Sequence, residues 1–445
     1  MRLLLIIFDG LGDRPAPELG GLTPLEAAHT PNVDRFAREG INGVLHGKSP
    51  GYVLGSPLAL HLMFGYEEEG FPDRGPLIAT ARGYAIADDE AVLAARLAVA
   101  DREDGALWLR ERFIREREEA CADLGAAIAS YETGGHRFRY EYSGRGDGLL
   151  FVSSLDPARP VSFEVTDTDP LAVDQPVLRA RPRAAARDPE AATRAAEALN
   201  DYLAWAHVTM SNHPASTVGG APINALISKW AGPRPSYEPF LERWGMRPAS
   251  LPDEEVVSGL LLEMGFHVSQ EAGTDPESDL RVRLEAARAR LDDGYEFVHV
   301  HTKYPDPMSH DNRPEVARDA IEALDRAMAY YWDAIGSDPS VVTVLTTDHT
   351  TPSVWAEHPR GKFNDQHGGE PGPLAIRGGN VRVDAVETFG ERAAALGGLG
   401  HLRGADFMPV LINAAERANM WEMRPTPVHR HYRPRPEDLE PLRFE

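Results

Sequence analysis

The sequence predicts an α/β protein with a mostly parallel sheet, helices on both faces of that sheet, and an inserted smaller α+β domain. Toward both ends of the chain, apolar segments typical of buried strands alternate with helical segments, as in a parallel sheet. Between them the pattern changes to segments that alternate apolar and polar residues. Because 445 residues suit two domains, we place one at residues 1–82 and 218–445 and the insert at residues 83–217.

The first predicted strand is the apolar run LLLIIF, residues 3–8, which ends at Asp9. The segment TPNVDRFAREG predicts a helix that follows, with Thr30 as its N-cap and Gly40 at its end. A glycine- and proline-rich segment comes next, from GKSPGYVLGSP to FPDRGP. Such punctuation is typical of a loop, and this loop carries Ser56.

The middle of the chain carries the alternating segments FRYEYSG, GLLFVSS and VSFEV together with two helical stretches rich in Ala, Glu and Arg. From about residue 218 the alternation of strands and helices resumes with YEFVHVH, PEVARDAIEALDRAMAYYWDAI, SVVTVL and GPLAI. We expect the C-terminal ends of these strands to meet at one edge of the sheet, where open α/β sheets bind their ligands.

The composition disfavours several functional classes. A net charge of −23 is unsuited to binding nucleic acid or an anionic membrane, so an anionic substrate would need a local positive site. Cys121 is the only cysteine, which excludes an intrachain disulfide and a thiolate zinc site. The apolar start runs directly into Asp9, unlike a signal peptide, and no segment reaches transmembrane length. We therefore expect a cytoplasmic protein, and the sequence leaves its oligomeric state open.

Carboxylate and imidazole side chains follow three predicted strands and precede a fourth apolar segment. They are Asp9 after LLLIIF, His301, Asp306 and His310 after YEFVHV, Asp348 and His349 after SVVTVL, and His367 before GPLAI. An adjacent Asp and His can also be an ordinary turn pair. A set of Asp and His without Cys suits zinc or manganese. Two such ions about 4 Å apart neutralise a phosphate and stabilise the attacking and leaving oxygens of a displacement.

Such a metal site needs a nucleophile, and Ser56 in VLGSPLALH is the candidate. The preceding glycine would let the backbone turn tightly and expose the hydroxyl. Metal coordination would lower the pKa of the hydroxyl enough for it to attack. A serine in a loop is more often a turn residue, so the prediction depends on the whole set of residues.

The order of these residues resembles that of the alkaline phosphatase superfamily, and within it the archaeal-type cofactor-independent phosphoglycerate mutases. The resemblance runs nearly end to end, through FDGLGDRP, TPLEAAHTPNVDRFAREG, LGS, TDTDP, HVHTKYPDPMSH, TTDHTTPSV, HGGEPGPLAI and GHLRGADFMPVL. It implies an alkaline-phosphatase-like catalytic domain with a substrate-capping insert. It also implies two divalent ions (manganese, zinc or magnesium), no bisphosphoglycerate and no nucleotide. The sequence likewise lacks a G-x-G-x-x-G motif after a strand.

The resemblance implies two sets of metal ligands. One ion would be held by Asp9, Ser56, Asp348 and His349, and the other by Asp306, His310 and His367. The segment WAEHPRGKFNDQ lengthens the loop before the last ligand and offers His358 as a competitor. We expect His367, because the family's histidine directly precedes a G-[DE]-P-x-P segment.

The resemblance also implies that Ser56 takes the phosphoryl group and returns it to the other hydroxyl, so that 3-phosphoglycerate and 2-phosphoglycerate interconvert. Lys303, one of four lysines in the chain, is expected to contact the transferred group. Arginines orient carboxylates and phosphates through bidentate bonds. The predicted substrate-binding residues are Arg74, Arg96, Arg145, Asp167 and Asp169. We expect the insert to close over the sheet edge.

Several positions depart from the family pattern, notably Pro57, Ile78 and Pro307, where the family usually has acidic residues. They leave the ligands and Ser56 intact and bear on the identity of the phosphoryl acceptor. One alternative is therefore a phosphohydrolase or phosphotransferase that acts on another small phosphorylated or phosphonylated acid. A non-catalytic scaffold is the other. His61 is expected to pack in its loop rather than to act as an acid or base.

Overall fold

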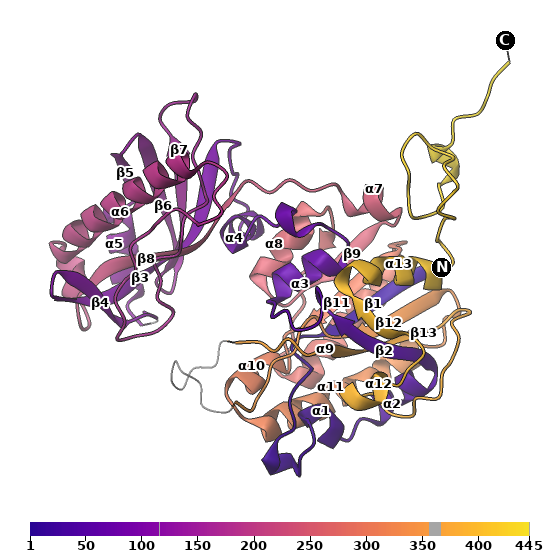
Figure 1. Ribbon diagram of the computed structural model, residues 1–445. Helices are drawn as coiled ribbons and strands as arrows, with labels where there is room; N and C mark the ends of the chain where they lie inside the picture. Colours follow the sequence, from indigo (N-terminus) through magenta and orange to yellow (C-terminus); the bar gives the residue numbers. More distant parts are fainter. Residues whose placement is uncertain (115, 356–365, 445) are drawn as a thin grey trace. The chain divides into compact units, whose positions relative to one another are not determined.

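The computed structural model describes residues 1–114, 116–355 and 366–444, and the chain divides into two compact units (Figure 1). The first unit comprises Met1–Phe71 and Tyr237–Glu445, and the second comprises Pro72–Ser236. The expected insert, residues 83–217, lies within the second unit. That unit extends further at both ends because helix α4 (Arg74–Ala81) packs against strands β3 (Glu90–Glu103) and β8 (Ile223–Pro233), which pair with each other.

Within the described residues, the first unit contains an eight-stranded sheet with the order β10-β9-β11-β1-β12-β13-β2-β14. Its strands are β1 (Arg2–Phe8), β2 (Gly40–His46), β9 (Pro248–Leu251), β10 (His267–Val268), β11 (Phe297–Thr302), β12 (Val341–Thr346), β13 (Gly372–Arg377) and β14 (Gly400–Arg403). Strand β13 runs antiparallel to both of its neighbours, and the other neighbouring pairs are parallel. The prediction of a mostly parallel sheet is confirmed.

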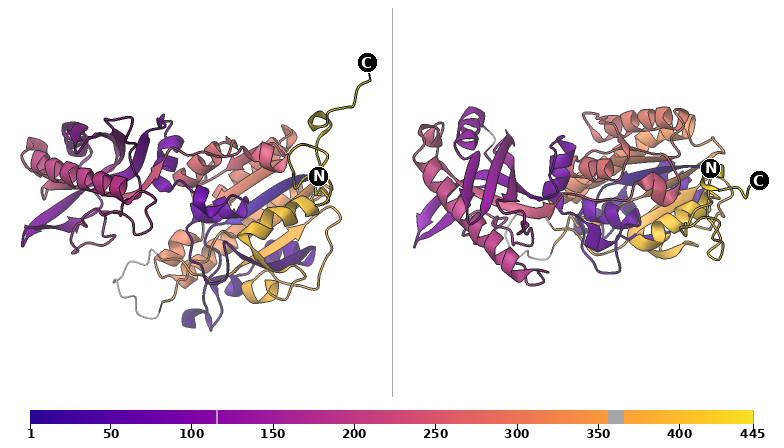
Figure 2. Two further views of the ribbon diagram at one scale, coloured as in Figure 1. Left: turned by 45° about the horizontal axis from the view of Figure 1, so that its top comes forward. Right: turned by 90° about the horizontal axis from the view of Figure 1, so that it is seen from above.

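The central strands β1, β11 and β12 are buried on both faces. Strands β1 and β12 therefore read as nearly continuous apolar runs, whereas β11 also buries His299 and His301. Helices cover both faces of this sheet (Figure 2). They are α1 (Pro24–Ala27), α2 (Pro31–Arg38), α3 (Ser56–Met63), α7 (Phe240–Trp244), α8 (Glu255–Glu263), α9 (Pro276–Asp292), α10 (Asp306–His310), α11 (Pro314–Ala334), α12 (Glu391–Ala394) and α13 (Gly404–Ala414). Residues of α2, α9 and α11 share one core cluster with Leu4 and Val298 of the sheet.

The predicted end of helix α2 is close to the observed one, but its cap differs. Thr30 occupies the N-cap position without a side-chain cap bond to the helix backbone. Its hydroxyl lies 3.5 Å from the Asp34 carboxylate instead. The helix ends at Arg38, and Gly40 already begins strand β2.

The second unit is built on a six-stranded antiparallel sheet within the described residues. Besides β3 and β8 it contains β4 (Ala106–Glu111), β5 (Ser130–Thr133), β6 (His136–Gly144) and β7 (Asp147–Ser154), with helices α5 (Glu118–Ala127) and α6 (Pro189–Ser211). The two helices share a core with the sheet that includes Cys121, and the Phe138 and Tyr202 rings stack at 4.7 Å. The segment VSFEV is not a strand. Its only β-type pairing among the described residues is an isolated bridge between Val165 and Pro182.

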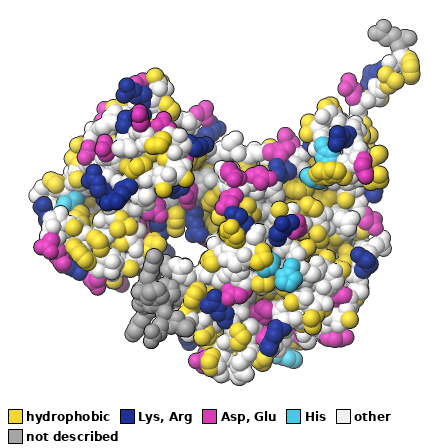
Figure 3. Space-filling model, in the orientation of Figure 1, with side chains coloured by type: hydrophobic (Ala, Val, Ile, Leu, Met, Phe, Trp, Pro, Cys, Tyr) yellow, Lys and Arg dark blue, Asp and Glu magenta, His cyan; other side chains and the backbone are white. Residues whose placement is uncertain are grey.

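Charged side chains of both signs are interspersed on the face of each unit seen in Figure 3. The net charge of −23 is therefore not gathered into one patch on that face. Among the described helices, none is both long and apolar enough to cross a membrane.

Candidate metal centre and anion site

The C-terminal ends of three parallel strands bring the predicted ligands together in the first unit. Ile7 of β1 pairs with both His301 of β11 and Thr346 of β12, so these strands end at the same level. Asp9 directly follows β1, and Asp348 lies two residues beyond β12. Residues that are far apart in the sequence thus lie close together at one edge of the sheet, as expected for a parallel sheet.

One group of possible metal ligands consists of Asp9, His301 and Asp348, whose ligand atoms all lie within 4.8 Å of one another. All three side chains are buried. His301 Nε2 lies 3.4 Å from Asp9 Oδ2 and 3.8 Å from Asp348 Oδ2. Both ring nitrogens of His301 and Oδ2 of Asp348 lack a hydrogen-bond partner among the described residues.

A second group consists of Asp306, His349 and His367, again with ligand atoms within 4.8 Å. The His367 ring stacks on the His349 ring at 3.7 Å, and His367 Nδ1 lies 2.6 Å from the Leu54 carbonyl. A proton on Nδ1 would leave Nε2 of His367 as the ligand atom. His310 Nε2 lies 3.2 Å from Asp306 Oδ1, so the predicted ligand His310 lies beside this group.

Ser56 is buried at the first position of helix α3, next to both groups. Its Oγ lies 3.1 Å from His349 Nε2 and 3.4 and 3.5 Å from the two oxygens of Asp9. The predicted reason for its position is wrong, because Gly55 has φ −97° and ψ 160°, an extended conformation that other residues adopt too. The start of the helix, rather than a glycine turn, positions the hydroxyl.

Lys303 places one positive charge among these carboxylates. Its Nζ lies 3.0 Å from Asp9 Oδ2, 3.3 Å from Asp306 Oδ2 and 3.4 Å from Glu254 Oε2. A backbone bond of 2.9 Å from its N–H to Asp253 holds the chain at this point. The cation therefore contacts a carboxylate of each ligand group.

Burial and charge shift the pKa values of this site in opposite directions. Burial opposes ionisation of Asp9, but Lys303 and two neighbouring histidines outweigh it and hold the pKa of Asp9 well below its usual value. Burial and the Asp9 charge raise the pKa of Asp348. His349 is buried as well, yet Asp348 and Asp9 raise its pKa to about 9. The pKa of His367 falls to about 3 through burial and the neighbouring His349.

These residues fit divalent metal ions. The site offers buried carboxylates and imidazoles, the donors that zinc and manganese take, and some of these donor atoms lack a protein partner. The negative charge that raises the pKa of His349 would be neutralised by cations. His349 lies between the two groups, since its Nε2 is also 3.0 Å from Asp9 Oδ1 and 3.6 Å from Asp348 Oδ2.

All predicted ligands thus lie around this sheet edge, and one further residue joins them. His301 is the second-last residue of strand β11 and was singled out in the sequence, but it is absent from the ligand sets that the resemblance implies. His358, the competitor of His367, lies outside the described residues.

The second unit carries a cluster of positive side chains around Asp169. Arg112 donates three hydrogen bonds to this carboxylate, from Nε at 3.0 Å to Oδ1 and 3.1 Å to Oδ2 and from Nη2 at 2.7 Å to Oδ2. Lys229 Nζ lies 3.8 Å from Oδ2. The Trp230 ring lies beside them, 3.7 Å from Lys229 Nζ and 4.9 Å from the Arg74 guanidinium carbon. We call these residues the Asp169 cluster.

Arg96 belongs to the same cluster, and it pairs with Asp147 at 2.5 Å. Burial is the main reason why the pKa of Lys229 falls to about 8; Asp169 opposes this shift, and the charges of Arg112, Arg96 and Arg74 add to it. The cluster thus holds more positive than negative charge, which suits an anionic ligand. Sequence reasoning missed Arg112 and Lys229. The rarity of lysine, which singled out Lys303, could also have pointed to Lys229.

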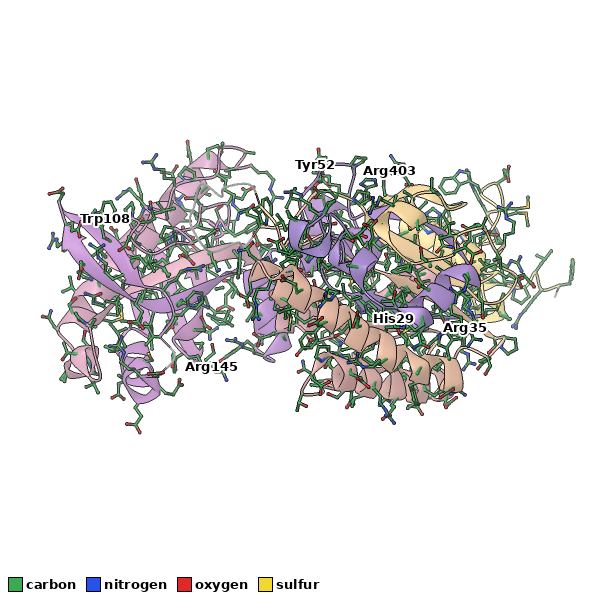
Figure 4. All side chains as sticks on the ribbon, turned by 90° about the horizontal axis from the view of Figure 1, so that it is seen from below. His29, Arg35, Tyr52, Trp108, Arg145 and Arg403 are labelled. Carbon is green, nitrogen blue, oxygen red and sulfur yellow. The ribbon has the colours of Figure 1, made fainter. Side chains whose placement is uncertain are left out.

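The remaining predicted residues lie elsewhere or have local partners. Arg145 is exposed in the turn between β6 and β7 (Figure 4), where its N–H bonds to Glu118. Asp167 accepts a 2.9 Å bond from the backbone N–H of Trp230, a residue at φ +59° within strand β8, and so supports the irregularity of the strand there. His61 is buried with one ring nitrogen 2.9 Å from Tyr237 Oη and the other 2.7 Å from the Glu67 carbonyl, which agrees with a packing role.

The fold and this donor set define a metal-dependent enzyme of the metalloenzyme superfamily, whose family model matches residues 1–414. Two curated relatives are 2,3-bisphosphoglycerate-independent phosphoglycerate mutases. That of Pyrococcus abyssi is 33% identical and aligns over 93% of this chain and 98% of its own; that of Methanopyrus kandleri is 31% identical over 94% and 97%. Within the superfamily, the chain therefore belongs to the family of 2,3-bisphosphoglycerate-independent phosphoglycerate mutases, and the resemblance seen in its motifs is confirmed.

Solved structures agree with this assignment. A protein of Pyrococcus horikoshii superposes with a TM-score of 0.74 at 28% identity, covering 95% of this chain and 99% of the other. The cofactor-independent phosphoglycerate mutase of Thermoplasma acidophilum superposes with a TM-score of 0.63, also at 28% identity, over 93% and 99% of the two chains. The similarity thus extends over both units of the chain.

Proposed function

We propose that this protein interconverts 3-phosphoglycerate and 2-phosphoglycerate without bisphosphoglycerate, through a phosphorylated Ser56. The position of Ser56 carries the proposal, because its buried hydroxyl lies 3.1 Å from His349 and 3.4 Å from Asp9, inside the group of metal-type side chains. The activity named for the curated relatives supports the same reaction. A cytoplasmic location remains a prediction.

Two divalent ions would be held by the ligands predicted from the resemblance, namely Asp9, Ser56, Asp348 and His349 for one ion and Asp306, His310 and His367 for the other. The share of imidazoles favours zinc or manganese over magnesium. When bound, the ions would neutralise the charge of the phosphate and lower the pKa of the serine hydroxyl.

In the first half of the reaction, the Ser56 hydroxyl loses its proton and its oxygen forms a bond to phosphorus. The bond from phosphorus to the substrate oxygen breaks, and that oxygen takes up a proton. In the second half, the other hydroxyl of the bound glycerate loses its proton and takes the phosphoryl group, which regenerates Ser56. No external phosphate donor is required.

Lys303 would contact the transferred phosphoryl group. Despite its burial, the carboxylates of Asp9, Glu254 and Asp306 hold the pKa of Lys303 well above its usual value, so the side chain stays positive through the cycle. A fixed cation that requires no reorganisation is an effective way to stabilise charge that develops in a transition state.

The Asp169 cluster would bind an anionic group of the substrate. Arg74 and Arg96 carry the predicted planar, bidentate donors, and Arg112 and Lys229 add two positive charges. Asp169 would orient Arg112, and Asp167 would hold the backbone at Trp230. Arg145, in its exposed turn, is a weaker candidate for substrate binding.

The test is an assay with purified protein, manganese or zinc, and 3-phosphoglycerate, in which 2-phosphoglycerate and free phosphate are followed together. Formation of 2-phosphoglycerate without phosphate is the expected result. Free phosphate alone would show that the phosphoserine is hydrolysed and would favour the phosphohydrolase alternative. Neither product, with intact metal binding, would indicate another phosphorylated or phosphonylated substrate.

A further inference from the structure

His301 is completely buried, and neither of its ring nitrogens has a hydrogen-bond partner among the described residues. Buried polar groups without a partner are rare, because they lose their bonds to water without replacement. The oxygen Asp348 Oδ2 is also buried without a partner, on the same side of the site. Two neighbouring unpartnered donor atoms suggest that a group absent from the protein chain satisfies both.

The distances around His301 are longer than those of well-formed charge-assisted hydrogen bonds. Its Nε2 lies 3.4 Å from Asp9 Oδ2 and 3.8 Å from Asp348 Oδ2, whereas charge-assisted N–H···O bonds measure about 2.7–2.9 Å. Ligands about 2.0–2.2 Å from a tetrahedral ion are separated from one another by about 3.3–3.6 Å. The 3.4 Å between His301 Nε2 and Asp9 Oδ2 matches this spacing, and the ligand atoms of all three residues lie within 4.8 Å of one another, close enough to share one ion.

The strand holds His301 in this position before any ion arrives. Strand β11 lies between β1 and β9, and its ladder with β1 pairs His301 with Ile7. His299, two residues earlier, has a separate partner, since its Nδ1 lies 2.9 Å from Ser250 Oγ on the paired strand β9. A ligand on a central strand is more precisely positioned than one on a loop.

We propose that His301 binds one of the metal ions directly, together with Asp9 and Asp348. This inference rests on the proposed function, to which it adds a ligand outside the set that the family resemblance implies. The competing explanation is that His301 is only a protonated partner of the two carboxylates.

The test compares wild-type protein with H301Q and H299Q. Each protein is dialysed against limiting manganese or zinc, and bound metal per chain is measured by mass spectrometry. We expect H301Q to bind one of the two ions at least about 10-fold more weakly, while H299Q keeps both. His299 is a matched control because it is buried on the same strand and face but lies outside the ligand group. Cobalt-loaded H301Q should also show a changed visible spectrum.

Wild-type affinity for both ions and an unchanged cobalt spectrum in H301Q would overturn the inference and leave the proposed function standing. A wild-type protein that binds no divalent ion would overturn both. If H301Q fails to fold, the test is made with H301D instead. Its carboxylate restores a ligand atom at this position, so H301D should fold and bind two ions when metal is supplied. An H301D protein whose folding does not respond to metal would contradict the inference.

Discussion

The two units of the molecule each gather charged side chains, but with opposite sign and by different means. In the first unit, parallel strands deliver Asp9, His301 and Asp348 from distant parts of the sequence to one sheet edge. In the second unit, antiparallel strands and their loops collect Arg112, Lys229 and other cations around a single carboxylate, Asp169. The first cluster suits cations and the second an anion. Local composition, rather than the net charge of −23, thus determines which ligands each unit can bind.

The largest expected effect is that of Ser56→Ala in the first unit. Without the nucleophile, turnover of 3-phosphoglycerate should fall on the order of 10⁴-fold or more, as for other enzymes that lose a covalent nucleophile. The measurement is the rate of 2-phosphoglycerate formation at saturating substrate.

Ser216→Ala in the second unit is the matched control, because Ser216 is equally buried and bonds only locally, to the Ile223 carbonyl at 2.9 Å. It should retain wild-type turnover. Substantial activity in Ser56→Ala would exclude the phosphoserine mechanism.

Removal of metal should affect the first unit and spare the second. Without cations, Asp9, Asp306 and Asp348 are left as neighbouring buried carboxylates, so the first unit should lose stability. At metal concentrations of about 100 Kd each bound ion contributes about 2.7 kcal/mol, which corresponds to roughly 5–10 °C per ion in the midpoint of thermal unfolding.

Hydrogen exchange measured by mass spectrometry, with and without chelator, separates the units. Peptides from β12 should exchange faster in chelator, whereas those from β7 should not change. Equal acceleration in both strands would show that metal binding stabilises the chain as a whole and would remove the contrast between the units.

Arg74→Gln in the Asp169 cluster should raise KM for 3-phosphoglycerate by roughly 10–100-fold. A change of this size corresponds to the loss of one hydrogen bond to a charged group. Arg145→Gln should change KM less than about twofold, because Arg145 lies in an exposed turn outside the cluster. Steady-state kinetics of both variants test this. The reverse order of effects would assign anion binding to the hairpin instead.

The smallest expected effect is a pH dependence that comes from Lys229. Its pKa of about 8 means that the side chain is positive below pH 8 and loses its charge as the pH rises through that value. Binding of an anionic substrate should weaken accordingly, so kcat/KM should decline a few-fold above about pH 8. In Lys229→Arg the guanidinium stays charged, and this decline should disappear; its persistence would place the titrating group in the metal centre.

The success of sequence reasoning also differs between the units. The meeting of the candidate ligands Asp9, Asp348 and His349 at one sheet edge could be predicted because each follows an apolar run, and a parallel sheet brings such positions together. His301 was singled out by the same pattern, but no ligand set included it; the contacts of its ring within strand β11 place it in a ligand group. The fold class could be predicted from the same apolar runs, because they are typical of the buried strands of a parallel sheet.

In the second unit, neighbours in an antiparallel sheet depend on register, which bulges shift. Strand β3 changes register against β8 twice, near Ala94 and Val99, and the sequence carries no simple sign of this. Lys229 and Arg112 therefore meet Asp169 in a way that spacing does not reveal. The boundaries of the second unit could not be predicted from the sequence either, because helix α4 belongs to it through tertiary packing on β3 rather than through its own composition.

Helix α3 begins at Ser56 itself, which has an electrostatic consequence for the proposed phosphoserine. The first turn of a helix has amide groups without intrahelical partners and carries about half a positive charge, which favours an anion. Pro57 gives up one of these amides but sets the backbone angle that the first turn requires. The peptide dipoles of a buried helix would thus act as a permanent, metal-independent counter-charge at the oxygen that, in the proposed mechanism, alternately carries and releases a phosphate.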